Sequence, residues 1–81
     1  MTYMYEVVVK RDIVAGGCRL PEGLSVRVAH DQMSSPLYSL DGKQRIAQAF
    51  AMQCGVDLSR ATNYISTAYM EAYRMQHYNM L

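Results

Sequence analysis

The sequence predicts a single α+β domain in which an N-terminal antiparallel sheet, with two long strands and a short third, packs against two C-terminal helices. Hydrophobic residues alternate up to about residue 30, as in strands, and recur at spacings of three and four after residue 41, as in helices. The period changes at the polar segment "HDQMSSP" (residues 30–36). Because a chain of 81 residues has room for one hydrophobic core, we take residues 1–81 as one domain.

The strands are expected within residues 3–30. The segment "YMYEVVVKR" (residues 3–11) alternates and is rich in valine, which favours strands. Its alternation directs one set of side chains toward the core: Tyr5, Val7 and Val9. In the segment "LSVRVA" (residues 24–29) the corresponding set is Leu24, Val26 and Val28. Two tight turns, at Gly16-Gly17 and at Pro21-Glu22-Gly23, isolate residues 18–20 as the short third strand.

The first helix is expected over residues 41–54. Asp41 can cap its N-terminus, and Gln44 three residues later completes a capping box. Apolar side chains recur on one face of this segment: Ile46, Ala49, Phe50 and Cys54. Gly55 then stands where a left-handed C-terminal cap belongs, so the helix should end at residue 54.

A second helix is expected over residues 58–75. Asp57 or Ser59 can begin it. The spacing gives it a core face: Leu58, Ala61, Ile65, Ala68 and Ala72.

Composition and charge exclude several classes of protein. Apolar residues make up 51% and charged residues 19% of the chain, which is unlike a disordered segment. The net charge of +1 creates no general field that would attract nucleic acid or an anionic membrane. No stretch approaches 18 consecutive apolar residues, and the first ten residues show no signal peptide. With only two cysteines, far apart in the chain, we expect a reduced, soluble, cytoplasmic protein.

The sequence contains no pattern that points to catalysis. His30 is expected to be solvated beside a loop, and Cys54 to be a small buried apolar residue. Gly16-Gly17 lacks the glycine pattern of a phosphate-binding loop and is followed by a strand. We therefore expect a protein that is not an enzyme, without cofactors, and assign no catalytic, cofactor-binding or metal-ligating residue.

Residues 50–65, "FAMQCGVDLSRATNYI", are also compatible with a helix-turn-helix, because a small residue and a glycine let two helices approach closely. Under this alternative the protein is a DNA-binding accessory protein that reads DNA through Arg60, Thr62 and Asn63. Against it, Asp57 would face phosphates, and only Arg60 supplies nearby positive charge. A plain helical corner is the preferred interpretation.

The C-terminal segment predicts a protein interface. A helix over residues 58–77 would be about 30 Å long and would carry more large apolar side chains than one small sheet can cover. Tyrosine and methionine suit contact surfaces, and four of them form the expected interface: Tyr69, Met70, Tyr73 and Met75. We therefore expect a small non-catalytic module that binds a copy of itself or another protein, with nucleic acid a lesser alternative and no membrane partner.

Four segments together resemble a family of short bacterial proteins that carry a domain of unknown function: "YEVVVKRDIVAGGCRLPEGLSVRV", "SSPL", "AFAMQCGVDLSRA" and "AY". The resemblance covers roughly residues 5–74. It implies a small stand-alone intracellular bacterial protein of uncharacterised role, and it offers no known catalytic residues to carry over to this sequence.

Strand facing can be tested by comparing Val26→Ala with Val8→Ala. If Val26 lies on the core face, its truncation should lower the free energy of unfolding by about 1–3 kcal/mol, because buried methyl groups are lost. Val8→Ala should cost less. Thermal melts that show Val8 to be the more sensitive site would mean that the strands face the opposite way.

Overall fold

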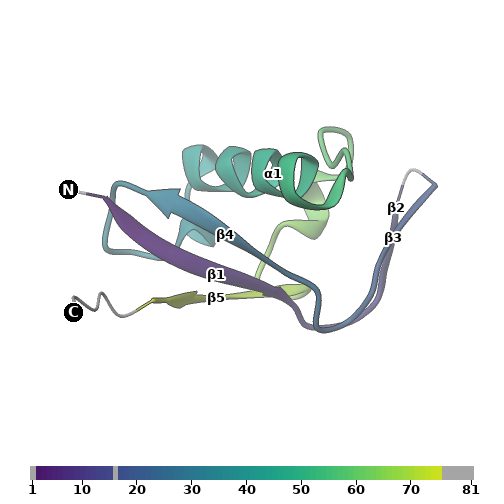
Figure 1. Ribbon diagram of the computed structural model, residues 1–81, viewed down its shortest axis with the longest axis horizontal. Helices are drawn as coiled ribbons and strands as arrows, with labels where there is room; N and C mark the ends of the chain where they lie inside the picture. Colours follow the sequence, from purple (N-terminus) through teal and green to yellow (C-terminus); the bar gives the residue numbers. More distant parts are fainter. Residues whose placement is uncertain (1, 16, 76–81) are drawn as a thin grey trace.

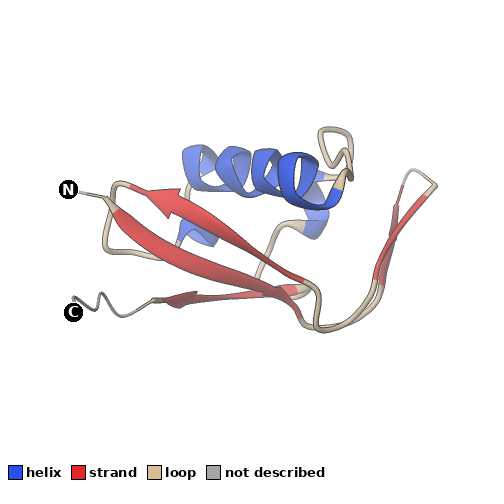
Figure 2. Cartoon of the chain, viewed as in Figure 1, coloured by secondary structure: helices blue, strands red, loops and turns tan. Residues whose placement is uncertain are grey.

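The computed structural model describes residues 2–15 and 17–75 and shows a small α+β fold with a helical layer on one face of an antiparallel sheet (Figures 1 and 2). The main sheet has the strand order β4-β1-β5, and α1 packs over β4. A separate hairpin, β2–β3, continues beyond one end of this sheet (Figure 1). The elements are β1 (Tyr3–Val9), β2 (Ile13–Ala15), β3 (Cys18–Leu20), β4 (Ser25–His30), the 3-10 helix η1 (Pro36–Tyr38), α1 (Leu40–Cys54), the 3-10 helix η2 (Thr62–Tyr64) and β5 (Met70–Arg74).

The central strand β1 is paired on both sides. It aligns Val7 with Val26 of β4 and with Ala72 of β5. The side chains expected to face the core do so: Tyr5, Val7, Val9, Val26 and Val28 are buried, and Leu24 is half-buried. Val8, on the opposite face, is half-buried. The facing of both long strands is therefore confirmed.

The short third strand exists, but it belongs to a different sheet. Residues 18–20 pair with β2, which the sequence did not predict, and this pair aligns Ile13 with Leu20. Both of these side chains are buried. Beside them, Asp12 accepts a hydrogen bond from the backbone N–H of Glu22 and pairs with Arg19, and these contacts lower the pKa of Asp12. The third strand of the main sheet is instead β5.

The first helix is found at Leu40–Cys54, but the predicted cap is wrong. Ser39 is the N-cap, and its Oγ accepts a hydrogen bond from the backbone N–H of Gly42 at 3.0 Å. Asp41 lies inside the first turn and forms an ion pair with Arg45 four residues later, at 3.1 Å. Gly55 ends the helix with φ of 70°, as expected for a left-handed cap.

The two predicted C-terminal helices are reduced to one, because the expected helix over residues 58–75 does not form. Residues 55–61 are irregular, η2 provides a single short turn, and β5 begins at Met70. The predicted core face is only partly buried: Leu58, Ala61 and Ile65 are buried, whereas Ala72 is half-buried and Ala68 exposed. The helical spacing thus identified three core residues but the wrong local structure.

Two physical reasons explain this error. Residues 59–67, "SRATNYIST", contain serine, threonine, asparagine and a β-branched isoleucine, which disfavour helix interiors. Residues 70–74, "MEAYR", also satisfy a period of two, with Met70 buried and Glu71 exposed. Without β5, β1 would leave the backbone groups on one of its sides without partners, so pairing in the sheet overrides the weak helical preference.

Gly42 allows α1 to approach η1. A Cβ atom at this position would lie 2.2 Å from the carbonyl oxygen of Pro36 and 2.5 Å from its Cα atom, both of them backbone atoms. Pro36 is itself buried, so it has little room to move away. The first turn of α1 therefore needs a residue without a side chain.

Gly42→Ala should lower the free energy of unfolding by at least about 1 kcal/mol, even though alanine is the better helix former, because the new methyl group forces backbone apart. Denaturant unfolding followed by circular dichroism would measure the change. Gln44→Ala, at an exposed position of the same helix, is the control and should be nearly neutral. Equal stability of the wild type and the Gly42→Ala variant would show that the contact with Pro36 is not tight.

Candidate functional site

The main sheet has two edge strands, β4 and β5, and each has backbone groups that point away from β1. On β4 these groups belong to Ser25, Arg27 and Ala29, because the residues that alternate with them bond to β1. An edge strand with free N–H and C=O groups is a template for pairing with another strand. Whether these backbone groups already have hydrogen-bond partners therefore decides whether each edge of the sheet can pair with another strand.

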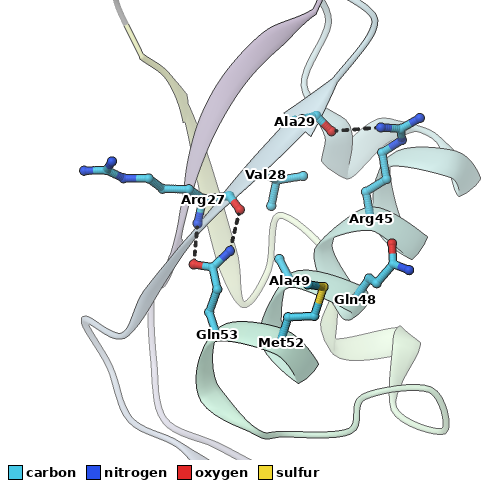
Figure 3. Close-up of a pocket in the computed structure, with 8 residues that line it drawn as sticks. All are labelled: Arg27, Val28, Ala29, Arg45, Gln48, Ala49, Met52 and Gln53. Atoms are coloured by element: carbon cyan, nitrogen blue, oxygen red, sulfur yellow. Dashed lines mark hydrogen bonds between the residues drawn. The ribbon is translucent and has the colours of Figure 1, made fainter.

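The β4 edge is occupied by side chains of α1. The carboxamide of Gln53 accepts a hydrogen bond from the backbone N–H of Arg27 at 3.1 Å and donates one to its carbonyl oxygen at 2.8 Å (Figure 3). The amide of Gln53 thus takes the place that a neighbouring strand would occupy. Arg45 adds a weaker hydrogen bond to the carbonyl oxygen of Ala29 at 3.4 Å.

Arg45 is held in place by two carboxylates. Asp41 lies 3.1 Å away on the same helix, and Asp31, just after β4, lies 3.6 Å away. The helix and the edge strand enclose a small open cleft, lined by Arg27, Val28, Ala29, Arg45, Gln48, Ala49, Met52 and Gln53 (Figure 3). The side chain of Arg27 extends away from this cleft (Figure 3), and Arg45 is paired with Asp31 and Asp41, so the cleft does not gather uncompensated positive charge.

The β5 edge lacks such protection. Lys10 donates a backbone hydrogen bond to Tyr69, and Met75 donates one to Met4, so the odd-numbered residues of this segment face β1. The backbone groups of Ala72 and Arg74 consequently point outward. Within the described residues, 2–15 and 17–75, no side chain or backbone group forms a hydrogen bond with them. We call these outward groups, together with a cleft that lies beside them and is lined in part by Ala72, the β5 edge.

A cleft runs beside the β5 edge on the side of η1. It is lined by Lys10, Ser35, Leu37, Tyr38, Thr67, Met70, Glu71 and Ala72. Tyr38 is 74% exposed, although its neighbour Leu37 is buried. A large aromatic side chain therefore stands exposed next to free backbone donors and acceptors.

The face of the sheet opposite α1, which we call the outer face, is not covered by any helix or strand that residues 2–15 and 17–75 form (Figure 1). It carries Met4, Glu6, Val8, Ser25, Arg27, Ala29, Glu71 and Tyr73. Met4 is 41% and Tyr73 52% exposed. The hydroxyl of Tyr73 donates a 2.8 Å hydrogen bond to Glu71, which raises the pKa of Tyr73. The outer face thus adjoins the β5 edge through Glu71 and Tyr73.

The four residues of the expected interface are separated by the fold. Tyr73 belongs to the outer face, and Met75 is half-buried just after β5. Tyr69 packs against the ring of Tyr64 and under the guanidinium of Arg11. Met70 is fully buried in the core of its own chain. The long apolar helix that motivated this interface is absent, so an interface in this region needs a different geometry.

The three residues expected to read DNA under the alternative, Arg60, Thr62 and Asn63, do not lie on a recognition helix. Arg60 is in an exposed turn, and Thr62 and Asn63 are exposed within the single turn of η2. No second α-helix packs beside α1 in the described part of the chain. The helix-turn-helix geometry of this alternative and the preferred helical corner are therefore both wrong, because each needs a second α-helix after α1.

His30 and Cys54, the two residues weighed above for metal binding or catalysis, lie in different surroundings. His30 is buried rather than solvated, and neither ring nitrogen has a hydrogen-bond partner among the described residues. Its ring lies edge-on to the ring of Tyr5, with ring centroids 6.1 Å apart. Cys54 is half-buried at the end of α1 and is not in a disulfide. Residues 2–15 and 17–75 contain no cluster of three or more histidine, cysteine or carboxylate side chains that could hold a metal ion.

The membrane-spanning potential of the helices can be judged from the structure. None of the helices formed by the described residues is long and apolar enough to cross a membrane.

The geometry defines a small α+β protein whose main sheet has one edge occupied by side chains of α1 and one edge, that of β5, whose outward groups at Ala72 and Arg74 have no partner among the described residues. The chain belongs to a family of unknown function, DUF6140, whose family model matches residues 1–72. The resemblance to a family without a known activity is therefore confirmed. No curated protein and no solved structure matches the chain.

Sequence reasoning missed the residues that distinguish the two edges. In the sequence, Gln53 and Arg45 cannot be distinguished from the other polar residues on the solvent side of an amphipathic helix. Their role depends on where α1 crosses the sheet, which the local pattern does not encode. The alternation of "MEAYR" was the one available signal for an edge strand.

Gln53→Ala should open the β4 edge. Loss of the two hydrogen bonds should lower the free energy of unfolding by about 1 kcal/mol, since water replaces part of the interaction. It should also increase concentration-dependent association, measured by light scattering, because a second edge becomes free. Gln48→Ala is a matched control, since Gln48 lines the same cleft without a hydrogen bond to the edge. Unchanged association of the Gln53→Ala variant would show that this side chain does not guard the edge.

Proposed function

We propose that this protein is a non-catalytic protein-interaction module that adds an extended segment of a partner protein to the β5 edge as a new strand. The observation that carries the proposal is the contrast between the edges. Gln53 satisfies the outward backbone groups of Arg27, whereas those of Ala72 and Arg74 have no partner among the described residues.

Strand addition gives each part of the β5 edge a role. The backbone N–H and C=O groups would supply affinity without regard to the partner's sequence. Side chains beside the edge would supply selectivity, and here these are the exposed ring of Tyr38 and the half-buried methyl group of Ala72. A partner residue on the same side of the added strand would pack into the cleft that these two side chains line.

A polypeptide partner fits this surface better than nucleic acid does. The groups at the edge are neutral amides, and the flanking charges include both Glu71 and Lys10. Lys10 also donates a hydrogen bond from its Nζ to the carbonyl oxygen of Thr67. Phosphate recognition requires several uncompensated cations on one face. The net charge of +1 supports the same choice.

We place the protein in the cytoplasm. The support is the unpaired thiol of Cys54, since free cysteines are ordinary in a reducing compartment.

Selection from a library of short linear peptides displayed on phage tests the proposed function. We expect selected peptides to shift the backbone amide signals of Ala72 and Arg74 in NMR spectra of the folded protein. Ala72→Pro should abolish binding, because proline removes the outward N–H group. Ala29→Pro makes the same change on the occupied edge and should leave binding intact. Peptides that instead shift signals around Gln53, or a library that yields no binder, would contradict the proposal.

A further inference from the structure

The β5 edge is complementary to itself. Two copies related by a twofold axis present the same surface to each other, and pairing of their edge strands must then be antiparallel. β5 spans Met70–Arg74, so its middle residue is Ala72, one of the two residues with free outward groups. A twofold axis at Ala72 would pair the whole length of β5 with its copy.

Charge distinguishes the possible registers. An axis at Glu71 would place two carboxylates opposite each other, and an axis at Arg74 would do the same with two guanidinium groups, and both arrangements are unfavourable. An axis at Ala72 pairs each Glu71 with a Tyr73 of the other copy and each Met70 with an Arg74. An axis at Tyr73 also avoids like charges, but it leaves Met70 outside the paired segment. The register centred on Ala72 is therefore the most favourable.

We propose that the partner at the β5 edge is a second copy of this chain, paired antiparallel about Ala72, so that two three-stranded sheets become one continuous sheet. This inference rests on the proposed function, because it uses the same edge and names its occupant.

The backbone groups at the edge fit this pairing. Ala72 would exchange both of its hydrogen bonds with Ala72 of the second copy. The N–H of Arg74 would donate to the carbonyl oxygen of Met70 on the other chain. The N–H of Met70 is already used, since it donates to the carbonyl oxygen of Ser66 at 2.8 Å. With these bonds, each outward backbone group of β5 would have a partner. The one exception would be the carbonyl oxygen of Arg74.

Side chains on both faces of the sheet support the same arrangement. On the outer face, the hydroxyl of Tyr73 lies beside its own Glu71 and would meet the Glu71 of the second copy. The two outer faces would become continuous. On the other face, each exposed Tyr38 stands at the cleft beside Ala72, next to the incoming strand. Burial of this ring adds hydrophobic stabilisation to the backbone pairing.

The occupied β4 edges determine where assembly stops. In the dimer, β4 forms both outer edges of the joined sheet, and there Gln53 already binds both outward groups of Arg27 and Arg45 binds the carbonyl oxygen of Ala29. A third copy would have to displace these side chains. The assembly is therefore a closed dimer rather than a fibre.

Sedimentation equilibrium over a wide concentration range tests the dimer. The wild type should approach twice its 9.2 kDa mass at high concentration. Ala72→Pro should raise the dissociation constant at least about tenfold, because the twofold axis removes the N–H donor from both chains. Ala29→Pro on β4 should leave the constant unchanged. Tyr38→Ser, at an exposed position, should weaken the dimer without loss of the folded structure, which circular dichroism would verify.

A second measurement does not depend on any variant. Backbone hydrogen exchange at Ala72 should slow as the wild-type concentration rises, whereas exchange at exposed Thr62 should not change. A mass of 9.2 kDa at all concentrations up to about millimolar would overturn the dimer. So would a dimer in which Ala72 exchanges as fast as in the monomer. If peptides still bind the β5 edge of such a monomer, the dimer fails while the proposed function stands.

Discussion

The pairing of both sides of β1 is the constraint on which the rest of the structure depends. β4 reaches one side soon after the β2–β3 hairpin, but the strand for the other side comes from the far end of the domain, where Lys10 bonds to Tyr69 and Met4 to Met75. This long-range pairing fixes the path of residues 55–69, which must return from the end of α1 to the sheet. It also buries Met70 beneath the helical layer. The irregular segment is thus a consequence of sheet completion rather than of its own local preferences.

The position of α1 creates the difference between the two edges. The helix lies over β4, and the close approach of Gly42 to Pro36 fixes its first turn. From that position its last turn brings Gln53 to the backbone of Arg27. η1, a single turn, lies near β5 and supplies an exposed ring at Tyr38 rather than a side chain that bonds to the edge. α1 therefore reaches only the β4 edge, and at the other edge no described residue bonds to the outward backbone groups of Ala72 and Arg74.

The sequence predicted an element correctly where its local pattern agrees with the way the element packs in the core, and it misled where the pattern and the packing differ. Alternation at Val7 and Val26 predicted both the strands and their buried faces, and Gly55 predicted the end of α1, because these signals act over a few residues. The spacing of Leu58, Ala61 and Ile65 correctly indicated burial but not conformation, since irregular chain can bury the same residues.

Ser39 and Asp41 could each cap a helix, and only the packing of η1 before α1 decides between them. Of the interface predicted from the tail, Tyr73 is exposed and Met70 is not, a difference set by the alternation of β5.

The proposed site consists mainly of backbone, and this explains why a search for chemical motifs did not find it. Any residue has an N–H and a C=O group, so no residue type marks a free edge, and Ala72 is inconspicuous in the sequence. What marks it is the contrast with β4, where the side chain of Gln53 acts as a substitute for a strand. In the proposed dimer, the occupied β4 edge and the β5 edge of one sheet would form a directional device that allows one pairing and opposes the next. Such a device needs correct placement of α1 and β5 but no buried charge and no reactive group. In the proposed dimer the backbone of β5 would therefore supply the pairing itself, whereas the side chains of Glu71, Arg74 and Tyr38 would set its register and its strength.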